Sequence, residues 1–191
     1  MKFLREAALD PKVKTIKITI YRLAEISHIA SSLINAAING KSVTVSIELQ
    51  ARFDEQANID YAQQMEKEGV NLVFGVQGLK VHSKMCVIER EEDNKLKRYG
   101  FISTGNFNES TAKIYTDYTL FTSNQGLLKD INKVFDFFER NYQIFKYKHN
   151  KYYELKSVLW KIIEKIGFLD FFSNQIYLKK CTTDTEFPIC Y

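Results

Sequence analysis

Residues 13–21 read Val-Lys-Thr-Ile-Lys-Ile-Thr-Ile-Tyr, and Ile16, Ile18 and Ile20 recur in this stretch at every second position. Side chains of a β-strand point alternately to opposite faces, so this spacing predicts a strand with one apolar face. Arg22 follows the stretch directly. The sequence therefore predicts a strand with a cation just beyond its carboxyl end, and the elements around it indicate the class of fold.

The segments after this strand alternate between helix and strand patterns. Ser27 is suited to cap the start of a helix, and Gly40 is suited to its end. The predicted elements are a helix at about 28–39, a strand at 42–49, a helix at about 54–68 and a strand at 70–74. Strands that alternate with helices form parallel sheets covered by those helices, so this half of the chain predicts a parallel sheet.

The second half of the chain follows another pattern. Strands at 80–89 and 97–104 flank a charged stretch at 90–97, and together these segments predict an antiparallel hairpin. A further strand is expected at 116–122 and a helix at 125–140. The chain is therefore predicted to form an α/β domain with a mixed β-sheet flanked by helices.

The composition is that of a folded protein without membrane spans. Of the 191 residues, 45% are hydrophobic and 26% are charged, and the net charge is only +4. The chain opens with an amphipathic helical pattern rather than a signal peptide, and no apolar run reaches the roughly 18 residues of a membrane span. Three scattered cysteines fit neither a disulfide framework nor a zinc site, which favours a reducing cytoplasm. The low net charge argues against nucleic-acid binding.

The stretch Lys80-Val81-His82-Ser83-Lys84 is the first candidate for chemistry. In a strand, residues 80, 82 and 84 point to one face, so two ammonium groups flank one imidazole. Such a trio is costly to bury without a partner or a ligand. Two interpretations follow: an exposed strand face with a solvated histidine, or a histidine nucleophile in a cationic pocket that receives an anion.

Further polar groups are expected at the same edge of the sheet. Ser103-Thr104-Gly105-Asn106-Phe107-Asn108 follows a strand directly, and its asparagines can donate hydrogen bonds to an anion. Arg22 and Arg52 each stand just beyond a strand end, where ligands bind in open α/β sheets. Taken singly, these residues are also compatible with a polar turn and surface salt bridges. Together they favour phosphate chemistry, because guanidinium groups suit phosphate oxygens.

Several longer stretches carry a resemblance to a known family. They are Ile16-Lys17-Ile18-Thr19-Ile20-Tyr21-Arg22, Glu48-Leu49-Gln50-Ala51-Arg52-Phe53-Asp54-Glu55, Gly78-Leu79-Lys80-Val81-His82-Ser83-Lys84, and Ser103–Asn108 with Thr111-Ala112-Lys113-Ile114-Tyr115-Thr116-Asp117-Tyr118. From about residue 2 to about residue 148 the chain resembles the long-chain type of polyphosphate kinase. The resemblance implies a phospholipase-D-like fold and a reversible transfer of the terminal phosphate of ATP onto polyphosphate through a phosphohistidine.

The resemblance also implies a role for each matching residue. His82 corresponds to the phosphorylated nucleophile, and Lys84 to a ligand of phosphate oxygens beside it. Tyr115 corresponds to a tyrosine that contacts the nucleotide. Arg22 and Arg52 match the arginines around the magnesium and phosphate site. The remaining phosphate ligands that the resemblance implies are Asn106 and Asn108. Lys80, which the strand pattern places on the face of His82, is a further candidate for phosphate binding and is also compatible with a solvated charge.

Cofactor, partners and location are likewise expectations from the resemblance. Mg²⁺ is expected to arrive with ATP, and the expected small-molecule partners are ATP, ADP and inorganic polyphosphate. Full-length members of the family are expected to form homo-oligomers in the cytoplasm, without nucleic acid. Peripheral association with a membrane is left open.

The resemblance does not cover everything. Residues 1–148 are expected to form most of the first of two phospholipase-D-like catalytic domains, incomplete at its amino terminus, so that the chain is a fragment of doubtful activity. Residues 149–191 are expected to be a divergent helical or poorly ordered tail, with an amphipathic pattern at 152–168. His28 and His149 are expected to be surface or packing residues.

Two other functions stay open at this point. One is a catalytically dead remnant that binds polyanions. The other is a phospholipase-D-like phosphodiesterase that acts as a homodimer, because two His-x-Lys sites are usually needed. The phospholipase D pattern has an acidic residue five positions after its lysine, where this chain has Glu89. We interpret Glu89 as a hairpin residue.

Overall fold

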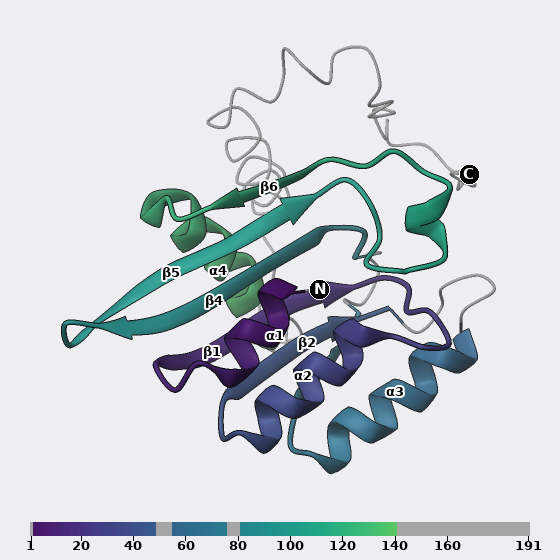
Figure 1. The fold of residues 1–191 in the computed structure, drawn as a ribbon, viewed down its shortest axis with the longest axis horizontal. Helices are drawn as coiled ribbons and strands as arrows, with labels where there is room; N and C mark the ends of the chain where they lie inside the picture. The colour runs from purple at the N-terminus through teal and green to yellow at the C-terminus, as the bar shows by residue number, and fades with distance from the viewer. Residues whose placement is uncertain (1, 49–54, 76–80, 141–191) are drawn as a thin grey trace, which may run out of the picture.

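The structure, a computed structural model, describes residues 2–48, 55–75 and 81–140. Its strands are β1 (Val13–Ile20), β2 (Ser42–Ile47), β3 (Asn71–Phe74), β4 (Lys84–Glu92), β5 (Lys95–Ser103) and β6 (Thr119–Thr122). In this part of the chain they form one sheet in the order β3-β2-β1-β4-β5-β6 (Figure 1). Strands β1, β2 and β3 run parallel, and β4, β5 and β6 each run antiparallel to their neighbours. The predicted mixed sheet is confirmed.

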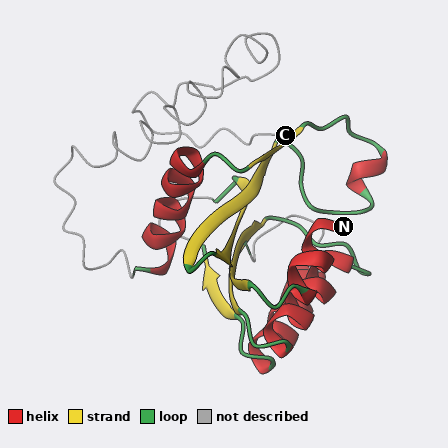
Figure 2. Cartoon of the chain, turned by 60° about the vertical axis from the view of Figure 1, so that its left-hand side comes forward, coloured by secondary structure: helices red, strands yellow, loops and turns green. Residues whose placement is uncertain are grey.

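The helices lie on both faces of this sheet. Helices α1 (Lys2–Leu9), α2 (His28–Ile38) and α3 (Glu55–Lys67) cover one face, and α4 (Gln125–Glu139) lies on the other (Figure 1, Figure 2). A short 3-10 helix, η1 (Thr111–Lys113), interrupts the loop between β5 and β6. None of the helices in the described ranges is long and apolar enough to cross a membrane.

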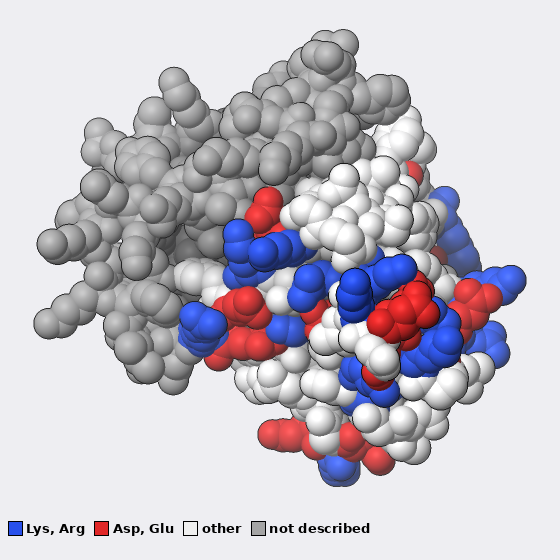
Figure 3. Space-filling model, turned by 90° about the vertical axis from the view of Figure 1, so that its left-hand side faces the viewer, with Lys and Arg blue, Asp and Glu red and all other residues white. Residues whose placement is uncertain are grey.

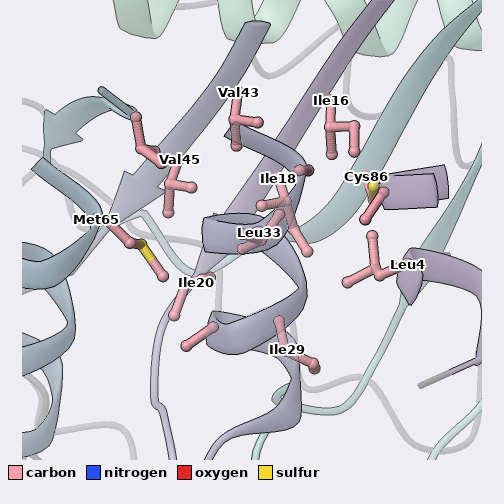
Figure 4. Close-up of a cluster of buried hydrophobic side chains, with 14 of the residues drawn as sticks. Leu4, Ile16, Ile18, Ile20, Ile29, Leu33, Val43, Val45, Met65 and Cys86 are labelled. Atoms are coloured by element: carbon pink, nitrogen blue, oxygen red, sulfur yellow. The ribbon is translucent and has the colours of Figure 1, made fainter. Parts of the chain in front are cut away.

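Alternation along the central strands produces two apolar cores. Ile16, Ile18 and Ile20 of β1 are at most 2% exposed and pack with Leu33 of α2 and Met65 of α3 (Figure 4). On the other face, residues of β4 pack against the apolar stripe of α4: Met85, Val87, Leu128, Ile131, Val134 and Phe135. The period-two pattern that predicted β1 therefore also fixes which face of the sheet the first three helices cover.

The hairpin differs from the prediction. Strands β4 and β5 extend into the charged stretch, and only Asp93 and Asn94 form the turn, with φ of 51° and 58°. Asparagine and aspartate tolerate this left-handed conformation, and a two-residue turn with both φ positive matches the twist of paired strands. The expected strand start at residue 80 is also wrong, because β4 begins at Lys84.

Charged side chains on the paired strands bond across the hairpin. Glu92 pairs with Lys97 at 2.9 Å, and Glu89 pairs with Arg98 at 2.7 Å. Blue and red side chains are interspersed on the side of the molecule where the hairpin projects (Figure 3). These pairs explain why a charged segment is regular strand, and they confirm that Glu89 is a hairpin residue.

We predict that Ile18→Ala lowers the free energy of unfolding by about 2–5 kcal/mol, because it removes a fully buried side chain from the first core. Ile38→Ala, at a position 60% exposed on α2, serves as the control and should change stability little. Urea unfolding of both variants measures the difference. Equal effects would contradict the packing described above.

Candidate active site

Three segments far apart in the sequence meet at one edge of the sheet. Strand β4 is antiparallel to β1, so it starts where β1 ends, and β5 is antiparallel to β4, so it ends there too. Residues that follow Ile20, precede Lys84 and follow Ser103 therefore lie at the same edge. This is the arrangement that the sequence predicted for the Arg22, His82 and Asn106 segments.

His82 and Lys84 form the centre of the cluster. The His82 side chain is exposed, whereas Lys84 is 5% exposed. Lys84 Nζ lies 2.9 Å from His82 Nδ1 and 3.0 Å from His82 Nε2, and it donates a hydrogen bond to the His82 carbonyl oxygen at 2.6 Å. An exposed imidazole thus lies directly against a buried ammonium group. A nucleophile accessible to an anion fits this placement, and an imidazole walled off by apolar residues does not.

The ring of Tyr21 packs against both His82 and Lys84. Its ring meets the His82 ring edge-on, with centroids 4.9 Å apart. Lys84 Nζ lies 5.3 Å from the Tyr21 centroid, and the Arg22 guanidinium carbon lies 5.6 Å from it. Cations over an aromatic face are attracted by its quadrupole. The sequence motif that contains Tyr21 predicted no role for it, although its position between the strand end and Arg22 places it beside the site.

Burial changes the acidity of Lys84. The pKa of its ammonium group falls from 10.5 to about 8. Desolvation is the main cause of this fall, the negative charge of Asp117 partly opposes it, and the positive charge of Arg22 adds to it. At neutral pH most of the group remains charged, yet a shift of this size brings proton loss close to physiological pH. Lys84 can therefore stabilise an anion and also exchange a proton.

The loop after β5 is held by Thr104 and Asp117. The Thr104 N–H donates to the Tyr118 carbonyl at 3.0 Å, the Tyr118 N–H donates to Thr104 Oγ1 at 3.0 Å, and Thr104 Oγ1 donates to Asp117 Oδ1 at 3.3 Å. A side chain on Gly105 would overlap the Asp117 carboxylate, so this position requires glycine. Asp117 is a residue of the site that sequence reasoning missed.

The two predicted asparagines occupy different environments. Asn106 Oδ1 is buried and has no hydrogen-bond partner within the part of the chain that the structure describes. Asn108 is 4% exposed, and its Oδ1 accepts hydrogen bonds from the N–H groups of Ser110 and Thr111, both at 3.0 Å, at the start of η1. If Asn108 binds phosphate, it does so through its amide nitrogen, because its amide oxygen already accepts these two hydrogen bonds.

Asn58 of α3 is a further residue that the sequence did not single out. It is fully buried, accepts a hydrogen bond from the Leu23 N–H at 2.9 Å and donates to the Tyr21 carbonyl at 3.1 Å. It also donates to the Glu48 carbonyl at 2.8 Å, just after β2. One side chain thus holds the backbone on both sides of Arg22. The signal was a polar residue at a helix position that should face the sheet.

The other residues predicted from the sequence either lie at the surface or fall outside the residues that the structure describes. Tyr115 follows η1 and is 67% exposed. His28 is the exposed first residue of α2, as expected for a surface residue, and its N–H donates to Glu109 Oε1 at 3.0 Å. The predicted site residues Lys80 and Arg52, and with them His149 and the tail 149–191, lie outside the described residues.

The described cluster does not fit a resident metal ion. Mg²⁺ prefers several oxygen ligands in octahedral geometry, and carboxylates usually supply them. Within residues 2–48, 55–75 and 81–140, no group of three or more histidine, cysteine, aspartate or glutamate side chains could hold a metal ion. The cluster instead gathers cations, which suit phosphate oxygens.

The fold and the cluster define the class of protein: a phospholipase-D-like α/β domain with a histidine and cations at one sheet edge. Residues 1–144 match the family model described as polyphosphate kinase C-terminal domain 1. The chain belongs to the polyphosphate kinase family.

Individual relatives give the extent of the similarity. The chain is 48% identical to the polyphosphate kinase of Vibrio parahaemolyticus over 148 residues, and 49% identical to that of Escherichia coli K12 over 143 residues. These regions cover 78% and 75% of this chain but only 21% of each relative. The crystal structure of Porphyromonas gingivalis polyphosphate kinase aligns with a TM-score of 0.63 and 42% identity, over 72% of this chain and 23% of that one. The chain thus spans about a fifth of the length of its relatives.

We predict that raising the pH from about 8 to about 10.5 stabilises the folded chain through Lys84. The unfolded lysine has its pKa at 10.5 and the folded one at about 8, so between these values this group binds more protons in the unfolded state and its contribution to the free energy of unfolding rises with pH. Burial raises the pKa of Cys86 and of Tyr99, which oppose this gain, so the gain is measured as the difference between the parent and Lys84→Met. Lys84→Met should abolish this gain, whereas Lys95→Met, at an exposed lysine, should keep it. Urea unfolding at pH 8 and pH 10 measures it. The same pH dependence in Lys84→Met and the parent would contradict the shift.

Proposed function

We propose that this chain carries the phosphohistidine site of an ATP:polyphosphate phosphotransferase. Family membership supports the reaction class, but the chain spans only 21% of its relatives, so the activity is a proposal for this chain. The observation that carries it is the exposed His82 imidazole against the buried Lys84 ammonium group, at the sheet edge that also holds Arg22.

The reaction is a pair of phosphoryl transfers. An unprotonated ring nitrogen of His82 attacks the γ-phosphorus of ATP, an N–P bond forms, the bond to the bridging oxygen breaks, and ADP leaves. A terminal oxygen of polyphosphate then attacks the same phosphorus, the N–P bond breaks, and the chain is longer by one phosphate. Both steps reverse with ADP as acceptor.

The side chains around His82 suit these steps. Charge spreads over the equatorial oxygens in the transition state, and fixed donors that need no reorganisation stabilise it. Lys84 is such a donor, because burial and three contacts within 3.0 Å to His82 hold it in place. Arg22, Asn106 and the amide nitrogen of Asn108 are proposed to bind the remaining oxygens. Tyr115, exposed on the loop after η1, is proposed to contact the nucleotide.

Residues beyond the described ranges complete the proposal. Lys80 and Arg52 are proposed as further phosphate ligands: Lys80 from its spacing to His82, and Arg52 from its place after a predicted strand and from the resemblance. Mg²⁺ is proposed to enter with ATP, bound to phosphate oxygens, and no step above depends on a protein ligand to it.

We predict that the chain incubated with γ-labelled ATP acquires an acid-labile, base-stable label, and that His82→Ala abolishes it. His28→Ala removes another exposed histidine and should keep the label. Mass spectrometry of the labelled peptide identifies the residue. Polyphosphate binding without any label would contradict phosphoryl transfer and favour a binding remnant, whereas turnover of phosphodiesters would favour a hydrolase.

A further inference from the structure

Thr19 is a buried residue beside the cluster that has no role in the proposed reaction, although it lies within the Ile16–Arg22 stretch. It is 1% exposed and is the second-to-last residue of β1. Its hydroxyl donates a hydrogen bond to the Ser83 carbonyl at 2.6 Å and accepts one from the Met85 N–H at 3.0 Å. The hydroxyl thus donates one hydrogen bond and accepts another, both with the backbone of the segment that enters β4.

These two hydrogen bonds lie at the end of the paired region between β1 and β4. The pairing of β1 with β4 runs from Val13–Arg90 to Ile18–Cys86, and Thr19 is the next residue along β1. Past the Ile18–Cys86 pair, the Thr19 hydroxyl links β1 to the residues at the start of β4 through the two hydrogen bonds given above. Because the Met85 N–H is buried, a side chain without a hydroxyl would leave it without this acceptor.

Lys84 lies between the two backbone groups that Thr19 holds. The Ser83 carbonyl precedes Lys84 and the Met85 N–H follows it, so the hydroxyl fixes the backbone on both sides of this residue. Lys84 Nζ in turn lies 2.9 Å and 3.0 Å from the His82 ring nitrogens. A shift of the 83–85 backbone would therefore move the ammonium group against the imidazole.

We propose that Thr19 is a positioning residue that sets the geometry of the His82–Lys84 pair. This role rests on the proposed phosphoryl transfer through His82. Thr19 acts through the backbone and touches neither the imidazole nor the phosphoryl group. Displacement of a catalytic group by about 1 Å can cost about 100-fold in rate. Loss of the hydroxyl should therefore slow phosphorylation of His82 and leave the affinity for ATP unchanged.

The chain offers a matched control in Thr44 of β2. Thr44 is 4% exposed, is paired with Lys17 in the parallel register and so lies on the same face as Thr19. Its hydroxyl accepts a hydrogen bond from Asn71 Nδ2 at 3.4 Å, away from the 83–85 segment. Thr44→Val and Thr19→Val thus make the same chemical change in the same kind of surroundings, and Thr19→Ser restores the hydroxyl without the methyl group.

The experiment compares the full chain with these three variants by two measurements. The first is the rate of His82 labelling across ATP concentrations; in Thr19→Val we expect about a 100-fold lower rate at saturation with an unchanged half-saturating concentration. The second is the NMR signal of the His82 ring, assigned with His82→Gln among the three histidines. It should shift in Thr19→Val and stay at the parent position in Thr19→Ser and Thr44→Val.

The two measurements separate the two proposals. If the parent chain takes no label, the proposed reaction fails, and the His82 signal still decides whether Thr19 positions the ring. A His82 signal and a labelling rate in Thr19→Val equal to those of Thr44→Val would overturn the positioning role. An effect of Thr19→Ser as large as that of Thr19→Val would overturn it too, because the methyl group would then be responsible. Should Thr19→Val fail to unfold cooperatively, Thr19→Ala is measured against Thr44→Ala by the same criteria.

Discussion

The buried ammonium group of Lys84 is the interaction on which the site depends. Removal of a cation from water is costly unless polar groups replace its hydration, and the fall of the pKa of Lys84 to about 8 reflects that cost. The His82 carbonyl, the His82 ring and the Tyr21 face surround the charge. A bound phosphoryl group would add negative charge where the protein supplies little. The buried ammonium group is thus the charge to which the proposed phosphate ligand would bind.

The central position of β1 makes this arrangement feasible. Strand β1 pairs in parallel with β2 on one side and antiparallel with β4 on the other, so the sheet changes direction at this strand. A parallel neighbour brings the carboxyl ends of strands together, and an antiparallel neighbour brings the amino end of β4 to the same edge. Arg22 and Lys84 can thus come from opposite ends of their strands and still lie over one tyrosine ring.

The sequence predicted what depends on local periodicity and failed where tertiary contacts decide. The isoleucines of β1 identified the strand and its buried face, and Ser27 and Gly40 bounded α2. The predicted start of β4 was wrong. The alternating sequence pattern extends back to residue 80, whereas the strand begins at Lys84, where its backbone pairs with β5. The segments bearing His82, Arg22 and Asn106 were brought together as expected. The contacts of Tyr21, Asn58 and Thr19 depend on partners distant in the sequence, so local periodicity did not predict them. For Tyr21 and Asn58 the sequence carried only a signal of position.

Neutral side chains hold the backbone on both sides of the two described cations. Asn58 bonds the groups that flank Arg22, and Thr19 bonds the groups that flank Lys84. A carboxylate beside a cation offsets the charge that an anion needs and competes with phosphate for the same donors. The negative charge of Asp117 acts on Lys84 in this sense, because it raises the pKa of that lysine. An amide or a hydroxyl that binds the backbone fixes the position without this competition. At Arg22 and Lys84, neutral groups thus fix the backbone without adding negative charge to that of Asp117.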